Sequence, residues 1–177
     1  MSYARRCIAL ILLLLAPATQ AQIEWLHLHQ AEFQVSLPGL DYEALPDVWQ
    51  RVELSRVPAE EDGITVGDLW LRFGFVLDAP PQRMHALRFD RIGPVKSIHV
   101  NGNLVHDEGS DRPYFHVRGT VSRFISVPPD LLRAGENTLL IRKHHGTAFR
   151  HAMTEVQVGP VELLRPGYDR YTLLVND

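Results

Sequence analysis

Cysteine is nearly absent from this chain. Among 177 residues there is one, Cys7, and it lies in the N-terminal leader. Once that leader is removed no thiol remains, which excludes a disulfide framework, a cysteine-ligated zinc site and a cysteine nucleophile. Such cross-links are not required at this length, because a domain of about 150 residues buries a sizeable apolar core by itself.

The sequence also lacks a strong charge of one sign. Its formal net charge is −3, so no basic field favours nucleic acid, and we expect no nucleic-acid partner. Hydrophobic residues make up 45% and charged residues 22%, which is typical of a globular domain. There is no internal repeat and no heptad pattern.

Long apolar runs are confined to the leader. Arg5 and Arg6 precede the apolar stretch Ile8 to Ala16, and small residues follow up to Ala21. This arrangement predicts a signal peptide over residues 1–21 and a periplasmic or secreted location. The alternative is a retained signal anchor, although the run is shorter than the roughly 20 residues that span a bilayer.

Period-two alternation predicts the fold class. Leu69, Leu71, Phe73, Phe75 and Leu77 fall on one face of a half-buried strand. In the stretch 97–105, Asn-Gly separates two short apolar runs, the signature of a type I′ hairpin. With twelve prolines and twelve glycines, the pattern favours an all-β antiparallel sandwich of the jelly-roll type over residues 22–165.

Several boundaries follow from the same reading. We expect a helical turn at 129–134, a strand at 137–143, a loop at 144–151 and a strand at 153–158. The strand at 153–158 could continue through 161–164, and residues 166–177 would form a tail or the start of a linker.

The residues also resemble a known family. The sequence is similar to galactose-binding-like jelly-roll domains, both those of glycoside hydrolase family 2 enzymes and the periplasmic sensor domains of bacterial diguanylate cyclases and histidine kinases. The resemblance covers roughly residues 45–165. The matching motifs are Trp70-Leu71-Arg72 with Phe75, Val100-Asn101-Gly102, Phe124 to Pro128, Leu131-Leu132, Gly135-Glu136-Asn137-Thr138-Leu139 and Val158-Gly159-Pro160.

This resemblance implies a non-catalytic, extracytoplasmic input domain of a membrane signalling protein. The alternatives are an accessory carbohydrate-binding domain of a family 2-like hydrolase and a free periplasmic binding protein. The partner would be a small molecule such as a carbohydrate, or another envelope protein, and a homodimer is an option. A membrane would be reached only through a segment absent from this sequence or a retained anchor.

Ligand-binding candidates come from loops, where binding residues concentrate on a rigid sandwich. An aromatic face can stack on a sugar ring, and a guanidinium fork can bind a carboxylate. Two aromatic candidates have an alternative interpretation: Trp49 could belong to the core, and Trp70 could pack under a loop. Arg142 and Lys143 could recognise a ligand, but the simpler prediction is that they are solvated charges at strand edges. The predicted binding residues are Trp49, Tyr114, His116, Arg118, His144 and His145.

The nine histidines do not predict a metal site. His27 and His29 would share one face of a strand, but neither they nor the group at 144–151 have the spacing of a zinc motif, and exposed loop histidines are the simpler interpretation. Asp107, Glu108 and Asp111 leave a structural calcium open, without the spacing of a helix-loop-helix site. We therefore assign no metal and no cofactor.

Catalytic motifs are also missing. The sequence has neither a Gly-x-Ser-x-Gly elbow nor a phosphate-binding glycine loop. No catalytic residue is assigned, and we expect a protein that is not an enzyme.

Overall fold

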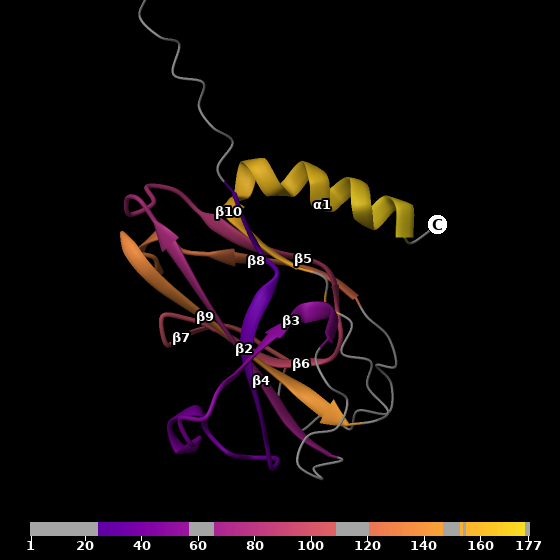
Figure 1. Ribbon diagram of the computed structural model, residues 1–177. Helices are drawn as coiled ribbons and strands as arrows, with labels where there is room; N and C mark the ends of the chain where they lie inside the picture. Colours follow the sequence, from indigo (N-terminus) through magenta and orange to yellow (C-terminus); the bar gives the residue numbers. More distant parts are fainter. Residues whose placement is uncertain (1–24, 57–65, 109–120, 147–152, 154, 176–177) are drawn as a thin grey trace, which may run out of the picture.

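The computed structural model describes residues 25–56, 66–108, 121–146, 153 and 155–175. These residues form two antiparallel β-sheets packed face to face, with one helix across the outer face of the smaller sheet (Figure 1). The predicted fold class, an all-β antiparallel sandwich, is therefore confirmed.

The larger sheet has six strands in the order β3-β2-β4-β9-β6-β7. Its two longest strands, β4 and β9, pair along twelve residues in the middle of the sheet. The strands are β2 (Gln30–Ser36), β3 (Gln50–Glu53), β4 (Val66–Leu77), β6 (Val95–Val100), β7 (Asn103–Asp107) and β9 (Gly135–Gly146).

The smaller sheet has four strands in the order β1-β10-β5-β8. They are β1 (Leu26–Leu28), β5 (His85–Ile92), β8 (Val121–Val127) and β10 (Val156–Pro160). Short 3-10 turns complete the chain: η1 (Tyr42–Ala44), η2 (Leu54–Arg56) and η4 (Pro129–Leu131). The turn η4 lies where a helical turn was expected.

The β6–β7 hairpin has the predicted geometry. Val100 pairs with Asn103, so the loop contains two residues. Asn101 and Gly102 adopt φ values of 49° and 82°, the left-handed conformation that a type I′ turn requires at both central positions.

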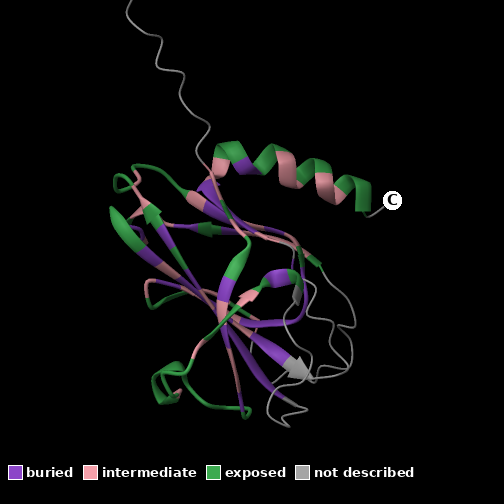
Figure 2. Ribbon diagram, in the orientation of Figure 1, coloured by how far each residue is buried: buried purple, intermediate pink, exposed green. Residues whose placement is uncertain are grey.

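The core lies between the two sheets and follows the alternation of the sequence. Leu69, Leu71 and Phe73 of β4 are at most 1% exposed, and they meet Phe89 of β5 and Val156 of β10 in one cluster (Figure 2). Each inward residue alternates with one on the outer face, which leaves that face free to carry polar side chains.

The helix α1 (Val161–Val175) departs from the sequence expectation. A continued strand at 161–164 was predicted, but the chain leaves the sheet after Pro160 and turns helical. Four residues are too few for periodicity to distinguish strand from helix. Leu164 is buried, and the Tyr168 ring lies 5.2 Å from that of Phe124 on β8.

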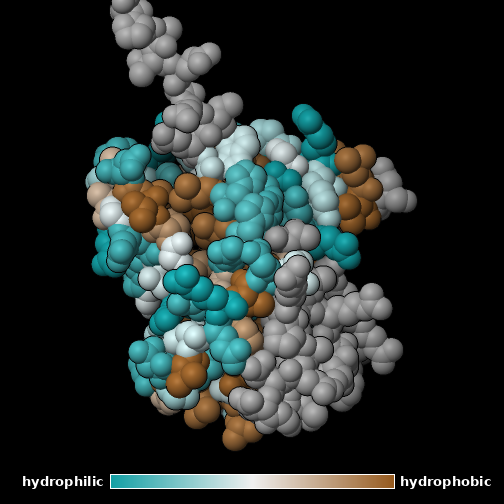
Figure 3. All heavy atoms as spheres, viewed as in Figure 1, coloured by the Kyte–Doolittle hydropathy of each residue, from teal (hydrophilic) through white to brown (hydrophobic). Residues whose placement is uncertain are grey.

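Residues 166–177, predicted as a tail or linker, fall mostly within α1. The last turn of the helix presents Leu173, Leu174 and Val175 to solvent, seen as the brown group at its end in Figure 3. In the described part of the chain, no helix has both the length and the apolar character to cross a membrane.

Candidate functional site

A cleft of about 570 Å³ opens on the outer face of the six-stranded sheet. Its floor comes from β4, β6 and β9. One wall is η1 with its preceding residue, and the other is formed by the β6–β7 hairpin. Because three neighbouring strands supply the floor, the side chains of the cleft stand on hydrogen-bonded backbone.

A buried ion cluster forms one end of the floor. The Asp68 carboxylate on β4 is fully buried and accepts hydrogen bonds from Arg142 Nε at 3.0 Å and Nη2 at 2.6 Å. The other oxygen of Asp68, Oδ1, pairs with Lys96 Nζ. The Gly39 backbone N–H donates to Oδ2 at 3.3 Å. Two cations thus converge on one buried carboxylate.

The β6 strand brings Lys96 to this cluster through an irregularity. The register of β6 with β9 shifts between Val95 and Ser97, so Lys96 sits at the bulge. A bulge re-aims a side chain that strict alternation would have sent to the other face. Lys96 therefore reaches the outer face although Ile98, two residues further along the strand, is in the core.

Aromatic rings line the wall formed by η1. The Tyr42 ring is 6.1 Å from Trp70 and 6.2 Å from Trp49, tilted in both cases. Trp70 is 2% exposed and donates from Nε1 to Ser36 Oγ at 3.1 Å. Packing of Trp70 under a loop, foreseen as an alternative, is confirmed, and Tyr42 is the aromatic group in this part of the cleft that a ligand can reach.

Two asparagines fix the rim opposite η1. Asn101 Nδ2 donates to Asn137 Oδ1 and to the Leu131 carbonyl, both at 2.8 Å, and its Oδ1 accepts from the Thr138 N–H at 2.9 Å. Asn137 in turn donates to the Arg133 carbonyl at 2.8 Å. Two motifs that carry the family resemblance are thus bonded to each other, and they hold the rim in place.

His99 stands on the floor between these groups. Burial lowers the pKa of its imidazole, so it is neutral at pH 7. Its Nδ1 is enclosed and has no hydrogen-bond partner among the described residues. The His99 ring is therefore a neutral side chain in the lining of the cleft.

The structure places the predicted site residues outside this cleft or outside the described chain. Trp49 is half-buried beneath the Arg72 guanidinium, 4.2 Å from its ring centre, and does not line the cleft. Tyr114, His116 and Arg118 lie outside the described residues. For these four residues a binding role stays a prediction.

The prediction of a loop at 144–151 is wrong for residues 144–146, because β9 extends to Gly146. His144 is buried rather than exposed; burial, followed by the positive charge of Lys96, lowers its pKa to about 3. The backbone of His145 pairs with Gly67 of β4. These residues were expected in a loop because paired histidines carry no strand signal.

Sequence reasoning missed Tyr42, Lys96 and Asp68. Tyr42 follows a Pro-Gly turn, which reads as plain loop. Lys96 interrupts an apolar strand, and a charge in such a position is a signal that could have drawn attention. Lys143 was expected as a solvated charge at a strand edge but is 1% exposed, because β9 is an inner strand and Lys143 lies on its inward face with Leu139 and Ile141.

Comparison with known proteins supports the fold. No family model matches the sequence, and no curated protein is significantly similar to it. The β-glucuronidase from Ruminococcus gnavus, in complex with C6-substituted uronic isofagomine, aligns at a TM-score of 0.57 and 14% identity. That alignment covers 76% of this chain and 28% of the enzyme.

Two further structures give similar results. The same enzyme with D-glucuronic acid aligns at a TM-score of 0.56 and 13% identity, over 76% of this chain and 29% of that one. The β-D-mannosidase from Dictyoglomus thermophilum aligns at 0.48 and 18% identity, over 68% of this chain and 15% of that one. The chain spans less than a third of each. The likeness to glycoside hydrolase family 2 sandwiches concerns the fold, and the likeness to sensor domains stays a prediction.

Proposed function

We propose that the chain is a non-catalytic, extracytoplasmic carbohydrate-binding module that holds a sugar in the cleft over β4, β6 and β9. The observation that carries this proposal is the cleft itself, which places the reachable ring of Tyr42 beside charged and polar side chains on a rigid sheet. A sugar presents an apolar ring face and a rim of hydroxyls, and such a surface matches both.

The polar groups of the cleft supply donors and acceptors. Arg142 and Lys96 can donate to ligand oxygens, whereas Asp41 and Glu43 on the η1 wall can accept from hydroxyls. Arg142 and Lys96 converge on Asp68 at one end of the cleft, and a guanidinium beside an ammonium is the arrangement that would recognise a carboxylate on a sugar. The ligand expected to bind most tightly is therefore an acidic sugar.

The chemistry of the buried carboxylate supports a binding role over catalysis. Asp68 is enclosed and held by two cations, which is unsuitable for a group that must give or take a proton from substrate. Asp41, Glu43 and Asp107 line the cleft as the remaining carboxylates there. Hydrolysis of nitrophenyl glycosides that disappears in Glu43→Gln would overturn the non-catalytic assignment.

Calorimetric titration with glucuronate, galacturonate, glucose and galactose tests the proposal. We expect an acidic sugar to bind, and Tyr42→Ala to weaken it at least tenfold because the stacking face is lost. Tyr171→Ala is the matched control, since Tyr171 lies on α1 across the molecule. No binding by any of these sugars, or equal affinity in Tyr42→Ala, would refute the site.

A sensory input role is the second candidate, and α1 is the observation that favours it. The helix follows β10 directly and packs on the four-stranded sheet through Leu164 and Tyr168, while Leu173 and Leu174 at its end face solvent. A ligand-dependent shift of the sandwich could reach a partner through this helix. The partner would be another envelope protein or a second copy of the chain.

Hydrogen exchange with and without saturating sugar separates the two candidates. In the sensory role, exchange in α1 changes on binding, although the cleft lies on the other sheet. In the accessory role, protection is confined to the cleft strands and η1. Light scattering of the same samples measures whether the ligand changes the oligomeric state.

A further inference from the structure

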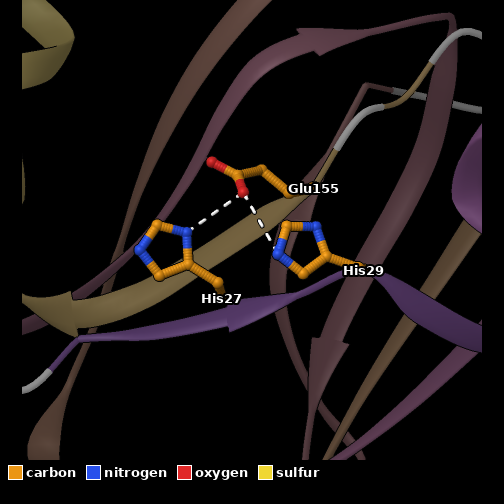
Figure 4. Close-up of side chains that lie close together, drawn as sticks. All are labelled: His27, His29 and Glu155. Atoms are coloured by element: carbon orange, nitrogen blue, oxygen red, sulfur yellow. Dashed lines mark hydrogen bonds and ion pairs between the residues drawn. The ribbon is translucent and has the colours of Figure 1, made fainter.

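Two histidines and a glutamate face one another at the β1 edge of the four-stranded sheet (Figure 4). In the antiparallel pairing of β1 with β10, His27 lies opposite Gln157, and one further step of the same register brings His29 opposite Glu155. Because side chains alternate, these four polar residues share the outer face, while Val156 points into the core.

The distances within this cluster suit a small cation. His27 Nδ1 is 3.0 Å and His29 Nε2 is 3.6 Å from Glu155 Oε2, and the three donor atoms lie within 4.8 Å of one another. Zinc–ligand bonds of about 2.0–2.1 Å at tetrahedral angles separate donor atoms by about 3.3 Å. Small side-chain rotations would therefore bring all three groups onto one ion.

The surrounding contacts orient the three groups. Gln157 Nε2 donates to Glu155 Oε1, so the other carboxylate oxygen is turned toward the histidines. The His29 carbonyl accepts the Leu54 N–H at 3.0 Å, which fixes the backbone where the chain passes from one sheet to the other. Hydrogen-bonded supports of this kind set the orientation of metal ligands.

We propose that His27, His29 and Glu155 form a binding site for a divalent transition metal, with Zn²⁺ the best match. Two imidazoles and a carboxylate suit zinc, nickel or copper, whereas calcium prefers oxygen ligands alone. The histidine side chains are 43% and 57% exposed, so an ion can enter and solvent can fill the remaining position. The bound ion would clamp the three-residue edge strand β1 onto β10.

Metal binding has a specific consequence for Trp25. Its indole Nε1 donates to His27 Nε2 at 2.7 Å, so in this arrangement His27 carries its proton on Nδ1. A neutral imidazole that binds a metal through Nδ1 carries its proton on Nε2 and can no longer accept that bond. Binding must therefore release Trp25 and change its fluorescence.

Titration of the tag-free protein with ZnCl₂, followed by calorimetry and tryptophan fluorescence, tests the proposal. We expect saturable binding of one equivalent, a fluorescence change at the same midpoint, and at least tenfold weaker binding in His29→Ala and Glu155→Gln. Trp25→Phe should bind zinc at least as tightly, because no hydrogen bond to His27 has to break, but should lose the fluorescence change. At 100 times the dissociation constant, zinc should raise Tm by about 5 to 10 °C.

His106→Ala is the matched control. His106 Nε2 also lies near a glutamate, 3.4 Å from Glu108 Oε1. Among the described residues, however, no third metal-binding side chain is close enough to make this pair a three-ligand site. The affinity of the His106→Ala variant for zinc should equal that of the parent protein. Circular dichroism of each variant checks that it is folded. Absence of saturable binding, or undiminished binding in both His29→Ala and Glu155→Gln, would overturn the site.

Discussion

Replacement of Lys143 by methionine should stabilise this protein. The side chain points into the sandwich with Leu139 and Ile141, is 1% exposed, and its Nζ has no hydrogen-bond partner among the described residues. Burial lowers the pKa of Lys143 from 10.5 to about 8. Since one pKa unit corresponds to about 1.4 kcal/mol, holding the charged form inside costs about 3 kcal/mol.

The lowered pKa of Lys143 also determines how the free energy of unfolding changes with pH. Between pH 8 and 10.5 the unfolded chain keeps the Lys143 proton and the folded chain does not, so stability rises with pH across that window. Below pH 8 the full penalty is present. Lys143→Met should therefore gain about 3 kcal/mol at pH 7, or roughly 6–12 °C in Tm, and much less at pH 10.5.

Urea unfolding of both proteins at pH 7 and pH 10.5 measures the effect. Lys96→Met is the matched control, because Lys96 is also nearly buried but is paired with Asp68. The same substitution should be destabilising there, since it removes a partner from a buried carboxylate. A Lys143→Met variant that is less stable at pH 7, or whose gain is the same at both pH values, would refute the reasoning.

Three further predictions concern the cleft and its supports. Asp68→Asn should lose about 3 to 5 kcal/mol in urea unfolding, because Arg142 and Lys96 would remain buried without their carboxylate; a loss under 1 kcal/mol would contradict it. Gly102→Ala should lose about 1 to 2 kcal/mol, since an alanine at φ 82° is strained although its Cβ meets no atom within 4 Å; unchanged stability would show that the turn relaxes. For His144, whose pKa is lowered to about 3, the unfolded state binds a proton at a higher pH than the folded state, so stability falls as pH drops from 6.5 toward 3. His144→Gln should weaken that fall in thermal unfolding between pH 7 and pH 4, and equal slopes would argue against it.

Local patterns were enough to predict the strands and the central turn. Alternation in β4 identified the inward face because a two-residue period is a property of any extended chain. Asn101 and Gly102 identified the hairpin because few residues tolerate two successive positive φ values. The same alternation, followed along β9 from Leu139, places Lys143 inside, although charge alone suggests the surface.

By itself, the sequence determined the fold class, since alternation and turn chemistry are local and each strand carries its own signal. Only the tertiary structure decided which polar groups meet. Asp68 and Arg142 are 74 positions apart and His27 and Glu155 are 128 apart, and each pair is joined by the order and register of strands. Pairing partners in an antiparallel sheet are chosen by the burial of the whole core, so no local pattern contains the cleft or the histidine cluster.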